Sequence, residues 1–439
     1  MQHRHLARLV WLLPATACLA AGFDLTPAAA ETLEAAIATA LQSSPVIAAR
    51  REEVAAAREN LNAAFAGFFP KLVLSGTAGL GNQPVTALSS PVSSLPAAAT
   101  LDQRTLGYGA ELDQPLFDGL RTVNTVEEAR QAAAAEEKDL MALRLQVQLD
   151  VARYYMAVVT GRSSVTLFKQ AAAMLESDLA LSRKQVERGE ATRTDLEQTT
   201  LRLADTRGNL AAAQAALAAS EASYEQVIGS VPAALVPPTA PDATLPASLE
   251  QGLSVALQAN PSVLAALCRE RSARSTVGKA EADFLPQVGL RAAYSRTYSQ
   301  PAVITDGGDA QLTVQVTLPI SVGGETLARV RQARAVLRQR LQETAARKAE
   351  IRALLRSSWA KLVAARQRVK LNRTAVEASE QALAGIRAQR KVGERTTLDV
   401  LNAQRDLIEI RQQQLQSRGD LLVAAYEILA DTGVIGTTP

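Results

Sequence analysis

The sequence predicts a mainly α protein with a membrane β-barrel portion, built as a tandem structural repeat. Three observations predict this class. The 439 residues are 47% hydrophobic but only 4% aromatic, a composition that favours long helices. Two long proline-free stretches carry apolar residues every seven positions, whereas four short segments alternate apolar and polar residues. Finally, the second half of the chain repeats the order of the first half.

Residues 1–30 have the features of a secretory signal peptide. Basic residues up to Arg8 precede an apolar run, and three alanines precede Glu31, as in a small-residue cleavage site. Cys18 leaves open a second processing route, in which cleavage precedes a lipid-modified cysteine. Either route exports the chain from the cytoplasm.

Charge and residue types exclude several classes of function. The whole chain has 47 basic and 44 acidic residues; without residues 1–30, which hold two basic residues and one acidic residue, 45 and 43 remain. This balance argues against nucleic acid as a partner. His3 and His5 leave with the signal, and Cys268 is then the only cysteine. We therefore predict no metal site, no cofactor and no enzymatic activity.

Internal similarity divides the remaining chain into two repeats, 31–229 and 248–434. The segment LEAAIATALQSSPVIAAR from Leu33 matches LEQGLSVALQANPSVLAA from Leu249. From Pro115 the match resumes with Pro319 at a shorter offset. Five prolines between the halves predict an extended linker at 230–247.

Each repeat is predicted to contain the same elements in the same order. Short helices end at a Ser-Ser-Pro or Ala-Asn-Pro sequence, and the long helices lie in the proline-free stretches. A helix of about 65 residues is roughly 100 Å long, too long for an ordinary globular domain. The first repeat is predicted to contain helices 32–42 and 46–68, strands at about 71–80 and 105–114, and helices 119–188 and 193–229. The second is predicted to contain helices 249–259 and 262–284, strands at about 287–296 and 311–318, and helices 324–391 and 396–431.

Seven-residue spacing in the long helices predicts antiparallel coiled coils. Val151, Val158 and Val165 start one such series, and Leu355 and Leu362 start another. A strict heptad stripe imposes left-handed supercoiling on a partner helix. Heptads alone also fit a soluble rod or tether, so the strands must decide between the two.

The four strand segments fit a transmembrane barrel. In the clearest one, Leu312, Val314 and Val316 alternate with polar residues, as expected for lipid on one side and water on the other. A half-buried soluble sheet shows the same alternation. Four strands cannot close in lipid, so the chain must assemble with copies of itself. Three copies give twelve strands and a continuous helical tunnel, although two or four copies are also compatible with the sequence; 81–104 and 297–310 become external loops.

With these features the chain resembles the TolC family of outer-membrane efflux channels over essentially all of its mature length. The tandem halves, the opening at Leu33 with its copy at Leu249, and the prolines that flank each strand pair carry the resemblance. It implies a homotrimeric exit duct in the lipid of the bacterial outer membrane, with its helical part in the periplasm. Such a duct passively exports drugs, small molecules or protein in a tripartite efflux pump or type I secretion system. Its partners are a periplasmic adaptor protein and an inner-membrane transporter of the ABC, RND or MFS type.

The resemblance also assigns roles to two duplicated turns, GEATRTDLEQ from Gly189 and GERTTLDVLN from Gly393. It implies that the turns dock the adaptor and that residues just beyond them close the tunnel with an aspartate ring and arginine links. The implied docking residues are Arg188, Gly189, Glu190, Val392, Gly393 and Glu394. The implied gate residues are Asp399, Asn402, Arg395, Thr194 and Asp195.

Asp195 and Asp399 have a second interpretation, because carboxylates near a helix N-terminus are stabilising. Capping and gating are compatible, since the gate needs only one aspartate of the pair. A periplasmic structural or tethering coiled coil without channel activity remains the alternative function.

Overall fold

The computed structural model describes residues 31–85, 99–239, 244–300, 307–320 and 324–433. The predicted signal peptide with Cys18 lies outside the described residues, as do the centres of the two predicted external loops.

The described residues form mainly helices with four antiparallel strands, which confirms the predicted class at this level. The first half contains α1 (Leu33–Ser43), α2 (Pro45–Phe65), β1 (Lys71–Val85), β2 (Ala99–Phe117), α3 (Arg121–Glu187) and α4 (Arg193–Ile228). The second half contains α5 (Leu249–Ala259), α6 (Pro261–Glu281), β3 (Gln287–Gln300), β4 (Gly307–Thr317), α7 (Glu325–Lys391) and α8 (Thr397–Thr432). Helices α3 and α7 each have 67 residues, and α4 and α8 each have 36.

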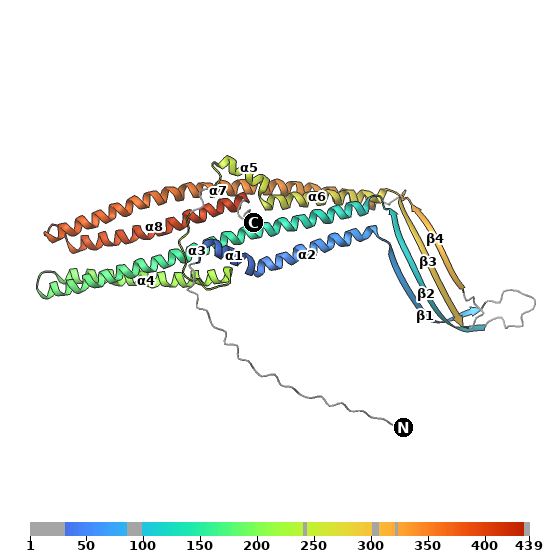
Figure 1. The fold of residues 1–439 in the computed structure, drawn as a ribbon, viewed down its shortest axis with the longest axis horizontal. Coiled ribbons are helices and arrows are strands. Elements are labelled where there is room, and N and C mark those ends of the chain that lie inside the picture. Colours follow the sequence, from blue (N-terminus) through green and yellow to red (C-terminus); the bar gives the residue numbers. More distant parts are fainter. Residues whose placement is uncertain (1–30, 86–98, 240–243, 301–306, 321–323, 434–439) are drawn as a thin grey trace, which may run out of the picture.

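The molecule is elongated, with its helical turns at one end and its sheet at the other (Figure 1). The hairpins α3–α4 and α7–α8 extend to the same end, and a helix of 67 residues is about 100 Å long. No helix in the described ranges has both the length and the hydropathy to cross a membrane.

Local geometry sets the helix boundaries. The sequence predicted a helix from residue 119, but α3 begins at Arg121 because Gly119 and Leu120 both have φ of +69°. The Asp118 carboxylate then accepts the Thr122 N–H at 2.7 Å. Single 3₁₀ turns over 66–68 and 282–284 follow α2 and α6, so these two α-helices are shorter than the predicted 46–68 and 262–284.

Heptad positions form the buried contacts between the helices. Val151 and Val158 are fully buried in a cluster that joins α1, α3 and α4. Leu355 and Leu362 of α7 are buried in a second cluster, together with residues of α5, α6 and α8. The Tyr155 hydroxyl lies 2.7 Å from the carbonyl oxygens of both Glu31 and Val236. The described parts of 230–247 contain no long helix or strand, and this contact fixes the linker to α3.

The strands form one sheet in the order β1-β2-β3-β4, with β1 and β4 as its edges. Strands were predicted to stop near 80 and 296 and to start again near 105 and 311. In the structure, 81–85, 99–104, 297–300 and 307–310 belong to the strands instead of external loops. Pairing continues there because backbone hydrogen bonds do not require an apolar alternation. Pro84 is tolerated on the edge strand β1, and Pro115 lies at a bulge in β2.

The sheet leaves large apolar side chains uncovered. Leu74, Leu80 and Leu312 are 75%, 83% and 72% exposed, and the helices extend away from the sheet without covering either face (Figure 1). Apolar exposure on this scale marks a surface that contacts lipid or another protein.

Candidate functional site at the hairpin turns

Gly189 reverses the chain between α3 and α4. Its φ is +73°, a conformation that side chains with a Cβ rarely adopt. The Gly189 N–H donates to the Val186 carbonyl at 3.0 Å and the Glu190 N–H donates to the Gln185 carbonyl at 2.8 Å. These bonds satisfy carbonyls at the end of α3. Arg188 and Glu190 form an exposed ion pair at 3.3 Å.

Gly393 makes the same reversal between α7 and α8, with φ of +84°. The Gly393 N–H donates to the Arg390 carbonyl and the Glu394 N–H to the Gln389 carbonyl, both at 3.0 Å. Val392 is 71% exposed beside this turn. All six predicted docking residues are therefore exposed at the tips of the hairpins.

Each turn is followed by a capping box. The Asp195 carboxylate accepts the N–H and hydroxyl of Thr192 at 3.1 and 2.7 Å, while the Asp195 N–H donates to the Thr192 hydroxyl at 3.1 Å. Asp399 and Thr396 repeat this arrangement with distances of 2.9, 2.9 and 3.2 Å. Both aspartates thus begin helices, as their capping interpretation requires.

The pKa values of both carboxyls are lowered by these contacts. For Asp195 the Thr192 hydroxyl is the main cause, and Thr397 and Arg390 from the second hairpin also lower the pKa. For Asp399 the main cause is the Thr396 N–H, followed by the Thr396 hydroxyl and the charge of Arg395. Asp195 therefore faces the neighbouring hairpin of its own chain.

The predicted gate residues are close together in the fold, but they do not form the predicted links within one chain. Arg395 donates from Nε to Gln389 Oε1 at 3.1 Å, inside its own hairpin. Thr194 is exposed. Asn402 accepts from Arg202 Nη2 at 3.1 Å, so its amide is directed towards α4.

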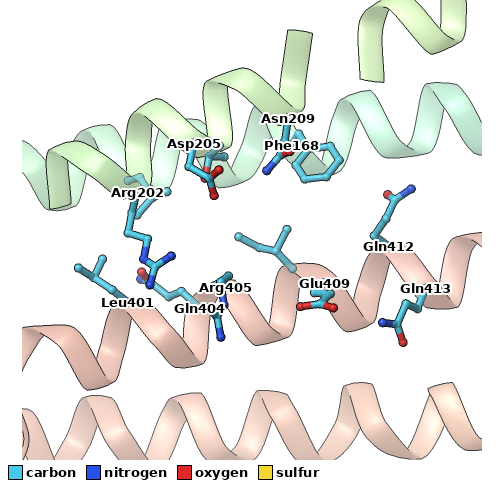
Figure 2. Close-up of a pocket in the computed structure, with 13 residues that line it drawn as sticks. Phe168, Arg202, Asp205, Asn209, Leu401, Gln404, Arg405, Glu409, Gln412 and Gln413 are labelled. Atoms are coloured by element: carbon cyan, nitrogen blue, oxygen red, sulfur yellow. The ribbon is translucent and has the colours of Figure 1, made fainter. Parts of the chain in front are cut away.

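A cavity of about 320 Å³ separates α3 and α4 from α8 just beyond these residues (Figure 2). Arg202 and Asp205 line it from α4, and Arg405 and Glu409 line it from α8. Gln404 donates to Asp178 Oδ2 at 3.0 Å and links α8 to α3. The two hairpins are thus joined by polar contacts around a cavity that has both polar and apolar lining residues.

The sequence prediction missed Arg202 and the cavity. The missed signal is a polar series with the same seven-residue spacing as the apolar stripes: Asp195, Arg202 and Asn209 on α4, with Asn402 and Glu409 on α8. The described residues contain no cluster of His, Cys, Asp or Glu arranged for a metal ion.

Long paired helices that end in exposed turns, joined to a sheet with an uncovered apolar face, are the architecture expected of a protein that contacts a membrane through its sheet. The chain belongs to the outer membrane efflux protein family, whose sequence profile matches residues 36–230 and 252–434. This match confirms the predicted family.

Individual relatives cover nearly the whole chain. Outer membrane efflux protein BepC of Brucella suis is 33% identical over 96% of this chain and 90% of its own length. Alkaline protease secretion protein AprF of Pseudomonas aeruginosa is 26% identical over 90% and 83%. A solved structure of CusC, the name of a cation efflux system protein in Escherichia coli, superimposes with a TM-score of 0.80 at 20% identity, covering 91% of each chain.

The function of the chain is therefore export through an outer-membrane channel. The chain is therefore a protein of the outer membrane. This role agrees with the predicted exit duct and with the predicted localisation.

Proposed function

We propose that three copies of the chain close one twelve-stranded barrel and form a single exit duct for a tripartite efflux pump or a type I secretion system. The observation that carries this proposal is the open four-stranded sheet. Its edges β1 and β4 have no partner strand in the described chain. Each unpaired backbone group costs several kcal/mol in lipid, and pairing the edges of neighbouring copies removes that cost.

The helices of the three copies form the tunnel. Since α3 and α7 are each about 100 Å long, they carry the duct from the membrane deep into the periplasm. The exposed turns then meet a periplasmic adaptor, which connects the duct to an inner-membrane ABC, RND or MFS transporter. The docking residues are Arg188, Gly189, Glu190, Val392, Gly393 and Glu394.

The gate lies just inside the turns. Three copies of Asp399 around one axis repel each other and attract cations. In the closed tunnel Arg395 reaches Thr194 and Asp195 of a neighbouring copy. The single chain leaves this link available, because the hydrogen bond of its Arg395 is to the neutral Gln389 side chain. Asn402 occupies the position of a second ring without adding charge.

The two halves derive from a tandem repeat. Equal helix lengths in the two halves and two separate matches to one family profile support this proposal. The inner-membrane transporter determines which cargo the duct exports. One relative is named for protease secretion and another for cation efflux, which are examples of a protein cargo and of a small cargo.

The proposal is tested by extracting the protein from outer membranes, counting cross-linked copies and recording single-channel currents in planar bilayers. We expect trimers that resist mild heating and that conduct. A monomeric protein in the soluble periplasmic fraction, with no channel activity, would contradict it and would favour the structural coiled coil.

A further inference from the structure

The register of the sheet determines which side chains share a face. Residues opposite each other in an antiparallel pair project to the same side. Leu106 is opposite Tyr298, Tyr108 is opposite Arg296, and Ala110 is opposite Tyr294. The same side, called here the apolar face, carries the following aliphatic residues: Leu72, Leu74, Leu80, Leu112, Leu290, Leu312, Val314 and Val316.

Two arginines interrupt the apolar face. Arg104 is opposite Leu80, and Arg296 is opposite Tyr108 and Gly308. They are the charged residues among the described side chains of this face, and both are exposed. A charge on a lipid-facing surface is costly near the membrane centre, so these two need a compensating partner or a position at the membrane boundary.

The arginine on the opposite face of the sheet has carboxylate partners. Arg291 pairs with Glu111 and lies 3.9 Å from Asp113, so carboxylates of the same sheet balance its charge. Across the strands, Arg296 is opposite Tyr108 and Gly308, and Arg104 is opposite Leu80 and Gln300, so neither arginine has a carboxylate opposite it. Their positive charge can therefore meet an anion from outside the chain.

Tyrosines surround Arg296. Its guanidinium carbon is 5.1 Å from the centre of the Tyr298 ring, a cation–π distance. The Tyr108 ring centre is 6.4 Å from that of Tyr294 and 6.3 Å from that of Tyr298. Tyrosines of this kind gather at the boundary between lipid and water, because one end of the side chain is apolar and the other is polar.

Arg296 and its tyrosines lie at the right depth for that boundary, and Arg104, opposite Gln300, lies four residues further along the strands. From Gln287, where β3 begins beside the helices, nine residues lead to Arg296, or about 30 Å along a strand. Strand tilt reduces this to about the 25 Å height of a barrel's apolar band. Because the helices are periplasmic, the cluster is at the outer leaflet.

We propose that Arg104, Arg296 and the three tyrosines bind a glycolipid of the outer leaflet through phosphate groups on its sugar headgroup. Guanidinium groups donate paired hydrogen bonds to phosphate, and the Tyr298 ring orients the Arg296 guanidinium. The acyl chains cover the leucines and valines of the same face, so a lipid matches the site better than free phosphate. The inference rests on the proposed barrel, which turns this face towards lipid.

Native mass spectrometry of the purified oligomer tests this site. The probes are bis-phosphorylated lipid A, the same lipid A after removal of its phosphates, and inorganic phosphate. We expect at least about tenfold stronger retention of the phosphorylated lipid, the change that one charge-assisted bond supplies. The variant R104Q/R296Q loses this preference, whereas R291Q, which alters the opposite face of the same strand, keeps it.

Equal retention of the two lipids by the wild-type oligomer overturns the site without relying on any variant. An unchanged preference in R104Q/R296Q also overturns it, and displacement of the lipid by inorganic phosphate at comparable concentration assigns the site to a free anion instead. An intact, conducting trimer without lipid preference contradicts this inference alone. Failure of the wild-type chain to form a trimer contradicts the proposed function.

Discussion

Asp399 both caps α8 and, in the proposed trimer, lies in the bore. These roles separate when Asp399→Asn is compared with Asp399→Ala, because asparagine keeps an oxygen that accepts from Thr396 but removes the charge. We expect both variants to weaken cation block and cation selectivity in planar bilayers. Only the alanine variant should also lower the thermal midpoint. Cation block equal to that of the wild-type channel in both variants would show that Asp399 is not part of the gate.

Asn402 is the position where a second charged ring is absent. Its neighbour Arg202 lies 3.1 Å away, so a carboxylate placed there is largely neutralised within the same chain. We expect Asn402→Asp to raise block by divalent cations modestly, and Asn402→Asp with Arg202→Gln to raise it several-fold more. Block constants from single-channel currents decide this, and equal constants for the two variants would contradict it.

Asp431 is a buried carboxyl in α8. It is 8% exposed, and the Ser358 hydroxyl donates to its Oδ2 at 2.6 Å. Burial raises the pKa of Asp431 above its ordinary value, although Ser358 and the charges of Lys361 and Arg153 lower it; Glu427 raises it further.

The direction of that shift fixes a pH dependence. A carboxyl whose pKa is raised by folding stabilises the native state below its unfolded pKa, and this contribution is lost as pH rises through the folded pKa. We therefore expect Asp431→Asn to gain stability relative to wild type as the pH rises above about 4, the ordinary pKa of an unfolded aspartate. Urea midpoints measured as a function of pH test it. Ser358→Ala, which keeps the carboxyl, should retain the wild-type direction.

At the scale of elements, Asp139 links the three helices α2, α3 and α6. Its carboxylate on α3 pairs with Arg50 of α2 at 3.0 Å and also with Arg269 of α6. We expect Asp139→Ala to reduce the free energy of unfolding by about 1–3 kcal/mol, since two partly buried charged hydrogen bonds are lost. The matched control is Asp420→Ala, whose pair with Arg368 at 3.1 Å is exposed.

Denaturant unfolding compares the two variants. An exposed ion pair contributes about 0–1 kcal/mol, so the control should remain close to wild type. Equal losses of unfolding free energy in Asp139→Ala and Asp420→Ala would show that the contacts of Asp139 stabilise the fold no more than an exposed ion pair does.

Most elements could be predicted from the sequence because their signals are local. Helix 249–259 has the predicted bounds, and the Thr-x-x-Asp pattern after each turn is enough to predict a cap. The strand extensions lacked a local signal, because Gly81 and Pro84 pair through their backbones without apolar alternation. The contact between Arg202 and Asn402 depends on how two hairpins 200 residues apart are placed, and no local pattern specifies that.

At the scale of the whole molecule, the exposed apolar face determines where the chain can reside. Leu74 is 75% exposed on that face. We expect Leu74→Lys to cost about 2–4 kcal/mol if the residue lies near the membrane centre, and so to deplete the oligomer from outer membranes. Fractionation followed by cross-linking measures the depletion.

The adjacent residue provides the control. Ser75 projects to the opposite face, where it is paired with Gly109, so Ser75→Lys should still give oligomers in the outer membrane. Depletion by both lysines, or by neither, would contradict the assignment of one face to lipid and the other to the lumen.

The strand order β1-β2-β3-β4 has a genetic consequence. Because the two edges of a chain differ, every contact in the proposed three-copy ring joins the β4 edge of one copy to the β1 edge of the next. A copy in which one edge strand cannot pair (a blocked copy) still enters the ring, because its other edge strand pairs with a neighbouring copy. In a cell that makes both chains equally, random mixing leaves only about one ring in eight free of the blocked copy. An allele that damages a single edge should therefore be dominant, whereas a null allele of the same gene should be recessive.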